Sequence, residues 1–336
     1  MDPVTHGLVG AAASQSISDK NKMRAAALTG AAAAMLADLD IFIDLPSNPL
    51  LNIEIHRQFT HSFIFIPVGA LVATLLLWWV MKKYLTLKEI YLYSLAGYAT
   101  AGILDAFTSY GTQLLWPFLE TRFAWNIISV VDPIVTGGLI LLITLALWKR
   151  NKAFVWGSWA WLIFFLLFGW VQKERGKTAA MEFAELQGHQ AEQLVVKPTI
   201  GNQILWRTNY IYEEIIYTNA VRAGLFSGIK IYEGESAPLI IPHKDFSDYK
   251  NTTLYNDLLR FSRLSEGYLV RHPENPKIIG DGRYSMLPTS MIPLWGVEAD
   301  TSNTDRHVPF LYFRDTSEAV RQEFLDMLLP NDSEYD

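Results

Sequence analysis

Long apolar runs dominate the first half of the chain and predict membrane-spanning helices. Residues 62–81 and 153–172 each form a run of twenty residues without a charged side chain, and a spanning helix needs about 20 mainly apolar residues. Two shorter apolar runs and two runs rich in Ala and Gly complete the set: 89–104, 133–148, 3–18 and 24–37. Small residues let helices pack closely against one another. We therefore expect an α-helical membrane bundle of about six helices, of which at least four span the membrane.

The second half has a different pattern, with short runs of β-branched and aromatic residues separated by turn-forming residues. Residues 172–193 predict a helix that leaves the membrane. The next runs predict a β-meander: 193–198, 202–208, 210–218, 220–226 and 228–232. Two helices and three strands that complete the sheet are expected after it: 256–266 and 317–329, then 268–270, 285–287 and 310–313. The bundle is thus followed by a C-terminal α+β soluble domain.

Charge divides the chain at the same place. Residues 1–171 hold 10 acidic and 11 basic residues, whereas residues 172–336 hold 24 and 17. We therefore expect a membrane-embedded domain at 1–172 and an α+β domain at 173–336. The chain has no cysteine, which excludes disulfides, thiolate metal ligands and a cysteine nucleophile. Neither half is strongly basic, so a nucleic-acid partner is not expected.

Lys and Arg residues in short loops predict the orientation, because they collect on the cytoplasmic side. In the six-helix topology, nine fall on one side: Lys20, Lys22, Arg24, Lys82, Lys83, Lys88, Lys149, Arg150 and Lys152. Five fall on the other: Arg57, Arg122, Lys173, Arg175 and Lys177. We expect the C-terminal domain on the second, extracytoplasmic side. The first run lacks a preceding basic segment, so we expect it to be retained and not cleaved as a signal peptide.

Histidines, acidic residues and their polar neighbours lie at the helix ends that this topology places on the extracytoplasmic side. They are His6, Asp38, Asp40, Asp44, His56, Arg57, His61, Asp105, Thr108 and Asp132. The topology was built from Lys and Arg in loops, so the shared side of these acidic and histidine residues is informative. Ionisable groups at membrane-helix ends are costly unless they are paired, hydrated or bound to metal. Ordinary interfacial polarity is the alternative reading.

The residue types favour a metal site. Histidine nitrogen and carboxylate oxygen are the usual zinc ligands where cysteine is absent. Three histidines and three aspartates exceed what one open site needs, so they could hold two metals or one metal with carboxylates that orient the histidines. Asp38 and Asp40 are two residues apart and would face different sides of a helix, so we expect a turn there. His56 and His61 are five residues apart, which requires some non-helical backbone between them if both are to reach one site.

These motifs resemble a known group of bacterial membrane proteins. Residues 2–7 read Asp-Pro-Val-Thr-His-Gly, residues 37–40 Ala-Asp-Leu-Asp and residues 56–62 His-Arg-Gln-Phe-Thr-His-Ser. Asp105, Thr108, Gly111 and Thr112 form an Asp-x-x-Thr-x-x-Gly-Thr block. Together they resemble the YdjM-like predicted inner-membrane metal-dependent hydrolases over about residues 1–135. The resemblance implies a multi-pass protein of the bacterial inner membrane with a metal site. A more distant similarity to zinc-dependent phospholipase C-type sites suggests phosphoester chemistry.

Each candidate residue takes a role in this hypothesis. We expect His6, Asp40, His61 and Asp105 to bind a divalent metal, with zinc favoured. Asp38 and His56 are further ligands or a general base. Arg57 clamps an anionic group or pairs with Asp44 or Glu54, and Thr108 supports the shell around the metal.

The favoured function is hydrolysis of a lipid or lipid-linked phosphoester at the extracytoplasmic membrane face. A membrane-anchored interaction protein with a structural His/Asp cluster is the alternative. A metal-ion transporter is disfavoured because no ionisable group marks the middle of a span. The sequence leaves open whether the protein is a monomer or a homo-oligomer.

Overall fold

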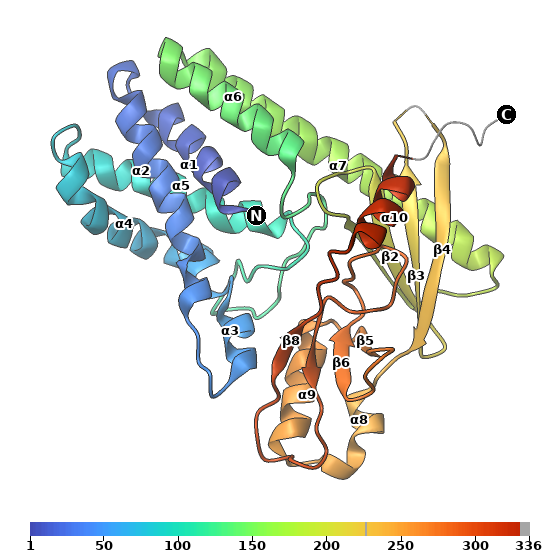
Figure 1. The fold of residues 1–336 in the computed structure, drawn as a ribbon. Coiled ribbons are helices and arrows are strands. Elements are labelled where there is room, and N and C mark those ends of the chain that lie inside the picture. Colours follow the sequence, from blue (N-terminus) through green and yellow to red (C-terminus); the bar gives the residue numbers. More distant parts are fainter. Residues whose placement is uncertain (226, 330–336) are drawn as a thin grey trace. The chain divides into compact units, whose positions relative to one another are not determined.

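The chain divides into two compact units in a computed structural model that describes residues 1–225 and 227–329 (Figure 1). The helical unit comprises Met1–Ile43, Ile55–Val171 and Ile200–Gln203. The C-terminal unit comprises Asp44–Glu54, Gln172–Thr199 and Ile204–Asp336. The change near residue 172 falls where the composition changes. The C-terminal unit additionally includes an early segment, Asp44–Glu54, from between two helices of the first half.

The helical unit contains the runs that the apolar pattern predicts. Its helices are α1 (Pro3–Ile17), α2 (Met23–Leu36), α4 (Ile66–Met81), α5 (Leu87–Ala106), α6 (Pro133–Lys149) and the first part of α7 (Lys152–Leu186). Among the described residues, three segments are long and apolar enough to cross a membrane, namely Lys20–Phe42, Phe63–Met81 and Lys152–Leu186. The expected fourth span is not reached on these criteria. Helix α6 is shorter, and α5 carries Lys88, Glu89 and Asp105 along with several hydroxyl side chains.

Glycines allow α1, α2 and α5 to pack backbone against backbone (Figure 1). A Cβ atom on Gly10 would lie 2.5 Å from the carbonyl oxygen of Gly30, and one on Gly97 would lie 2.3 Å from the same oxygen. Ser14 Oγ bridges α1 to α5 by donating to the carbonyl of Tyr93 at 2.7 Å. The sequence prediction that the Ala/Gly-rich runs are close-packing helices is confirmed.

The C-terminal unit begins with a four-stranded antiparallel meander that follows the end of α7. Its strands are β1 (Gln193–Pro198), β2 (Leu205–Tyr212), β3 (Ile215–Ala223) and β4 (Ile229–Pro238), hydrogen-bonded in that order. The meander is confirmed, but the predicted boundaries between 202 and 225 are wrong, and residue 226, where one predicted strand ends, lies outside the described residues. Mostly buried residues continue β2 as far as Tyr212 and begin β3 at Ile215, so the strand ends differ from those predicted. The chain turns between them at Glu213 and Glu214, which both have positive φ angles.

A second sheet forms where the sequence predicts an extension of the first. Strands β5 (Leu269–Arg271), β6 (Ile278–Asp281), β7 (Trp295–Glu298) and β8 (Phe310–Tyr312) pair antiparallel in chain order. The remaining helices of this unit are α3 (Pro49–Ile55), α8 (Pro242–Asp245), α9 (Thr253–Leu264) and α10 (Glu318–Leu328). The predicted strand at 285–287 is not formed; Arg207 binds the carbonyl group of Leu287 and those of neighbouring residues on either side of this stretch.

Arg207 fastens the segment that follows β6. It is 4% exposed, and its Nη1 donates to the carbonyls of Leu287, Pro288 and Ser290 at 3.1, 3.0 and 2.8 Å. Nη2 donates to the carbonyl of Gly282 at 2.8 Å. The buried guanidinium thus substitutes for a neighbouring strand along this segment.

We expect Arg207→Ala to destabilise the C-terminal unit by about 3 kcal/mol, because it leaves buried carbonyls without donors. Hydrogen exchange of the full chain in detergent should show faster exchange in peptides covering 282–291. Unchanged protection in those peptides would contradict the role given to Arg207.

Candidate metal centre

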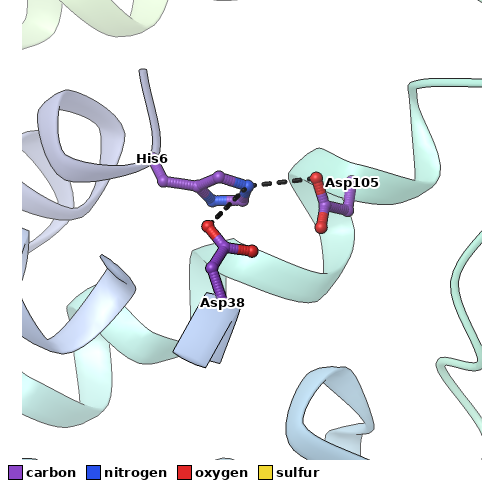
Figure 2. A group of neighbouring side chains, drawn as sticks. All are labelled: His6, Asp38 and Asp105. Carbon is purple, nitrogen blue, oxygen red and sulfur yellow. Dashed lines mark hydrogen bonds and ion pairs between the residues drawn. The ribbon is translucent and has the colours of Figure 1, made fainter. Parts of the chain in front are cut away.

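Three helix ends bring the core of the site together (Figure 2). His6 lies in the first turn of α1, Asp105 lies in the last turn of α5, and Asp38 lies in the 3-10 helix η2 (Ala37–Phe42) that follows α2. His6 Nε2 lies 3.0 Å from Asp105 Oδ1 and 3.8 Å from Asp38 Oδ2. One ligand atom from each of the three residues lies within 4.8 Å of the others.

Local sequence explains where these side chains begin. Asp2 caps α1 by accepting from the backbone N–H of Thr5, and Pro3 follows at the start of the helix, a position that favours proline. Asp38 and Asp40 share a 3-10 helix where the spacing predicts a turn. With three residues per turn, side chains two positions apart point in different directions. This difference separates the contacts of the two aspartates.

His61 joins the group from the short 3-10 helix η3 (Phe59–His61). Its Nε2 lies 3.3 Å from Asp38 Oδ1 and 3.1 Å from Asp105 Oδ2, and its Nδ1 lies 2.9 Å from Thr60 Oγ1. Burial lowers the pKa of His61, but the carboxylates of Asp105, Asp38 and Asp40 outweigh burial and raise it to about 10. The carboxylates therefore create a negative potential that favours a cation here.

Asp40 lies beside this group and organises the segment that follows α3. Its Oδ1 lies 2.7 Å from His56 Nδ1, and its Oδ2 accepts from the backbone N–H of Arg57 at 2.9 Å and from Thr60 Oγ1 at 2.6 Å. The expected non-helical backbone between the two histidines is present, because Arg57 has a φ of 59°. Both oxygens of Asp40 thus contact protein groups, whereas Asp38 faces His6 and Asp105.

Arg57 and Thr108 flank Asp105. Arg57 Nε forms an ion pair with Asp105 Oδ2 at 3.0 Å, and Nη1 donates to Thr108 Oγ1 at 3.0 Å. Thr108 Oγ1 donates in turn to the carbonyl of Asp105 at 2.7 Å. The alternative pairing of Arg57 with Asp44 or Glu54 is wrong, because Arg57 turns toward Asp105 and Glu54 pairs with Arg260.

Sequence reasoning missed two further contacts at this site. The guanidinium carbon of Arg57 lies over the Tyr110 ring, 5.3 Å from the centroid of that ring. The centroids of the Tyr110 and His56 rings are also 5.3 Å apart. Its place inside the Asp105–Thr112 block is the signal that could have identified it. The amino group of Met1 also contacts Asp105 Oδ1. Asp132, in contrast, caps α6 by accepting from Ile134 and Val135.

The donor set fits a divalent cation. Asp38 Oδ2 and His6 Nδ1 are buried atoms with no hydrogen-bond partner among the described residues, and Asp105 Oδ2 makes the charged contacts with Arg57 and His61 given above. The carboxylates of Asp38, Asp40 and Asp105 lie beside Arg57, the Met1 amino group and His61, whose raised pKa keeps its ring protonated. If His61 lost its proton, the carboxylates would leave an excess of buried negative charge, which is costly unless another cation, such as a metal ion, compensates for it. Nitrogen and oxygen ligands suit zinc and related metals, and three protein ligands leave a position open.

Comparison with known proteins supports the assignment of the first half. A family model described as the YdjM inner membrane protein matches residues 1–176, which include every residue of the site. No curated protein and no solved structure gave a significant match to the chain. Because the matched segment covers more than half of the sequence, the chain belongs to the YdjM inner membrane protein family.

Proposed function

We propose that the protein is an integral-membrane metal-dependent hydrolase that acts on a lipid or lipid-linked phosphoester. The observation that carries this proposal is the buried convergence of His6, Asp38 and Asp105, with Arg57 paired to the same Asp105. A metal-dependent hydrolase needs three ligands, an open position and a cation that binds the substrate anion.

His6, Asp38 and Asp105 would hold the metal, with His61 beside them. When bound, a metal of this kind lowers the pKa of a coordinated water and polarises the scissile group. His56 is the candidate for moving the proton, because its Nδ1 contacts Asp40 and its side chain is 18% exposed. A carboxylate contact of this kind fixes the orientation of an imidazole ring.

Arg57 would bind the substrate anion. Its Nε contacts Asp105 and its Nη1 contacts Thr108, and we assign Nη2 to an anionic oxygen of the substrate. The planar guanidinium suits phosphate oxygens, and its position over the Tyr110 ring adds a cation–π contact. Replacing Arg57 by lysine would lose this fork.

The location of the site favours a lipid substrate. The ligands lie at helix ends of the helical unit, which contains apolar candidate membrane spans and matches an inner membrane protein family. A lipid could therefore reach them by lateral diffusion. The excess of Lys and Arg on the opposite loops supports an extracytoplasmic site. Ion conduction is disfavoured because α4 carries no charged residue along its length.

Activity of the His61→Ala variant tests the proposal. We expect hydrolysis of phospholipids and polyprenyl phosphates by the purified protein to be lost, because His61 contacts both Asp38 and Asp105. Membrane insertion should be unchanged.

His243→Ala is the matched control, since His243 bonds Tyr255 in the C-terminal unit and should not affect turnover. Full activity of His61→Ala at the metal content of the wild type would contradict the role of His61 in the proposed hydrolase site.

A further inference from the structure

A segment of the C-terminal unit lies in the sequence between residues of the metal centre. Asp44–Glu54 belongs to the C-terminal unit, whereas the chain on both sides belongs to the helical unit. Asp40 precedes the segment, and His56 and Arg57 follow it. The C-terminal unit therefore holds the stretch of backbone from which two of the site residues emerge.

Both apolar packing and charge hold this segment. Leu50 is fully buried in a cluster that includes Leu254 and Leu258 of α9. From the same helix, Arg260 makes a two-pronged contact with Glu54, with Nε 2.9 Å from Oε1 and Nη2 2.7 Å from Oε2. Bidentate pairs of this kind fix geometry as well as supply energy.

Arg260 is itself held in one orientation. Its Nη1 donates to Asp257 Oδ1 at 2.8 Å and to Asn48 Oδ1 at 3.0 Å. Asp257 is 1% exposed, and its Oδ2 lies 2.9 Å from His307 Nδ1 and accepts from the backbone N–H of Val308 at 3.0 Å. These contacts hold the Arg260 guanidinium in one orientation, and its contact with Glu54 in turn fixes the position of the Glu54 side chain.

Glu54 lies at the end of α3, immediately before the site residues. Helix α3 ends at Ile55, His56 follows, and the chain turns sharply at Arg57 with a φ of 59°. Asp40 then bonds both the His56 ring and the Arg57 backbone. A shift of Glu54 would be passed directly to these two residues, and through Arg57 to Asp105.

We propose that Arg260 is a positioning residue for the metal centre: by fixing Glu54 and α3, the C-terminal unit sets the placement of His56 and Arg57. This inference rests on the proposed function. The C-terminal unit would then contribute to the metal centre by positioning residues, although the proposed metal ligands all belong to the helical unit.

Metal affinity of the full chain in detergent tests the proposal. We expect Arg260→Ala and Glu54→Gln each to weaken Zn²⁺ binding about 10-fold, because a displaced Arg57 would no longer orient the ligand Asp105. Arg260→Lys should recover part of the affinity. The visible spectrum of bound Co²⁺ should change in the two weakened variants, because the spectrum reports ligand geometry.

Arg263→Ala is the matched control, because Arg263 is an exposed arginine of the same helix. Wild-type Zn²⁺ affinity and Co²⁺ spectrum in Arg260→Ala and Glu54→Gln would overturn the proposal, as would an equal loss in Arg263→Ala. If Arg260→Ala fails to fold, Glu54→Gln at a half-buried site decides the matter. A wild-type chain that binds no metal would instead overturn the proposed function.

Discussion

Asp105→Asn should reduce metal affinity at least about 100-fold, more than the loss of an orienting partner would. Asp105 is fully buried and meets His6 through Oδ1 and both His61 and Arg57 through Oδ2. The amide has nearly the same shape but carries no charge, so it is a poor ligand and no longer balances Arg57. Hydrolysis should fall with metal content, and both can be measured on the same detergent-purified samples.

Asp132→Asn provides the control for burial and helix-end position. Asp132 is 2% exposed and caps the start of α6, yet it contacts none of the metal candidates described above. We expect this variant to keep wild-type metal content even if its thermal stability falls. Equal metal content in Asp105→Asn and the wild type would remove Asp105 from the site.

The second large effect is expected from Gly30→Val, which should prevent the packing of α1, α2 and α5. A Cβ atom at Gly30 would lie 1.9 Å from Ser14 Oγ and 2.4 Å from the Gly10 carbonyl oxygen, far inside contact distance. Overpacking of this kind costs about 3 kcal/mol or more. Because His6, Asp38 and Asp105 come from or directly follow these three helices, metal binding should be lost with the packing.

Gly137→Val controls for the loss of a glycine in a membrane helix. A Cβ atom at Gly137 would meet no atom within 4 Å, so this variant should melt like the wild type and keep its metal. Thermal denaturation and metal content of both variants in detergent measure the difference. A Gly30→Val protein with wild-type melting and metal content would contradict the close helix packing described above.

The helices of the first half were predictable because each apolar run carries its own signal. The predicted run 133–148 became α6 within one residue, and 62–81 differs mainly at its start, where residues 63–65 form a 3-10 turn ahead of Pro67. The sheets were less predictable, since strand ends depend on distant partners. Nothing near residues 285–287 indicates that Arg207, some eighty positions earlier, binds the carbonyl groups of Leu287 and Pro288.

The proximity of the candidate site's side chains was predictable, but their individual contacts were not. Successive membrane helices run in opposite directions, so counting the predicted helices shows which helix ends lie on the same side of the membrane. The difference between Asp38 and Asp40 depends on the 3-10 geometry of η2, which two-residue spacing does not reveal. Asp44–Glu54 belongs to the C-terminal unit through contacts with α9, about 200 residues away, where Leu254 packs on Leu50 and Arg260 pairs with Glu54, so local sequence holds no sign of it.

Elemental analysis of the detergent-purified wild type beside a His61→Ala, Asp105→Ala double variant tests the central claim most directly. The account predicts stoichiometric metal in the wild type and its loss in the double variant, with both proteins inserted in the membrane. The absence of metal in both proteins, after purification without chelator and attempted reconstitution with divalent metals, would contradict a metal centre. It would leave the His/Asp cluster with a structural role in a membrane-anchored interaction protein.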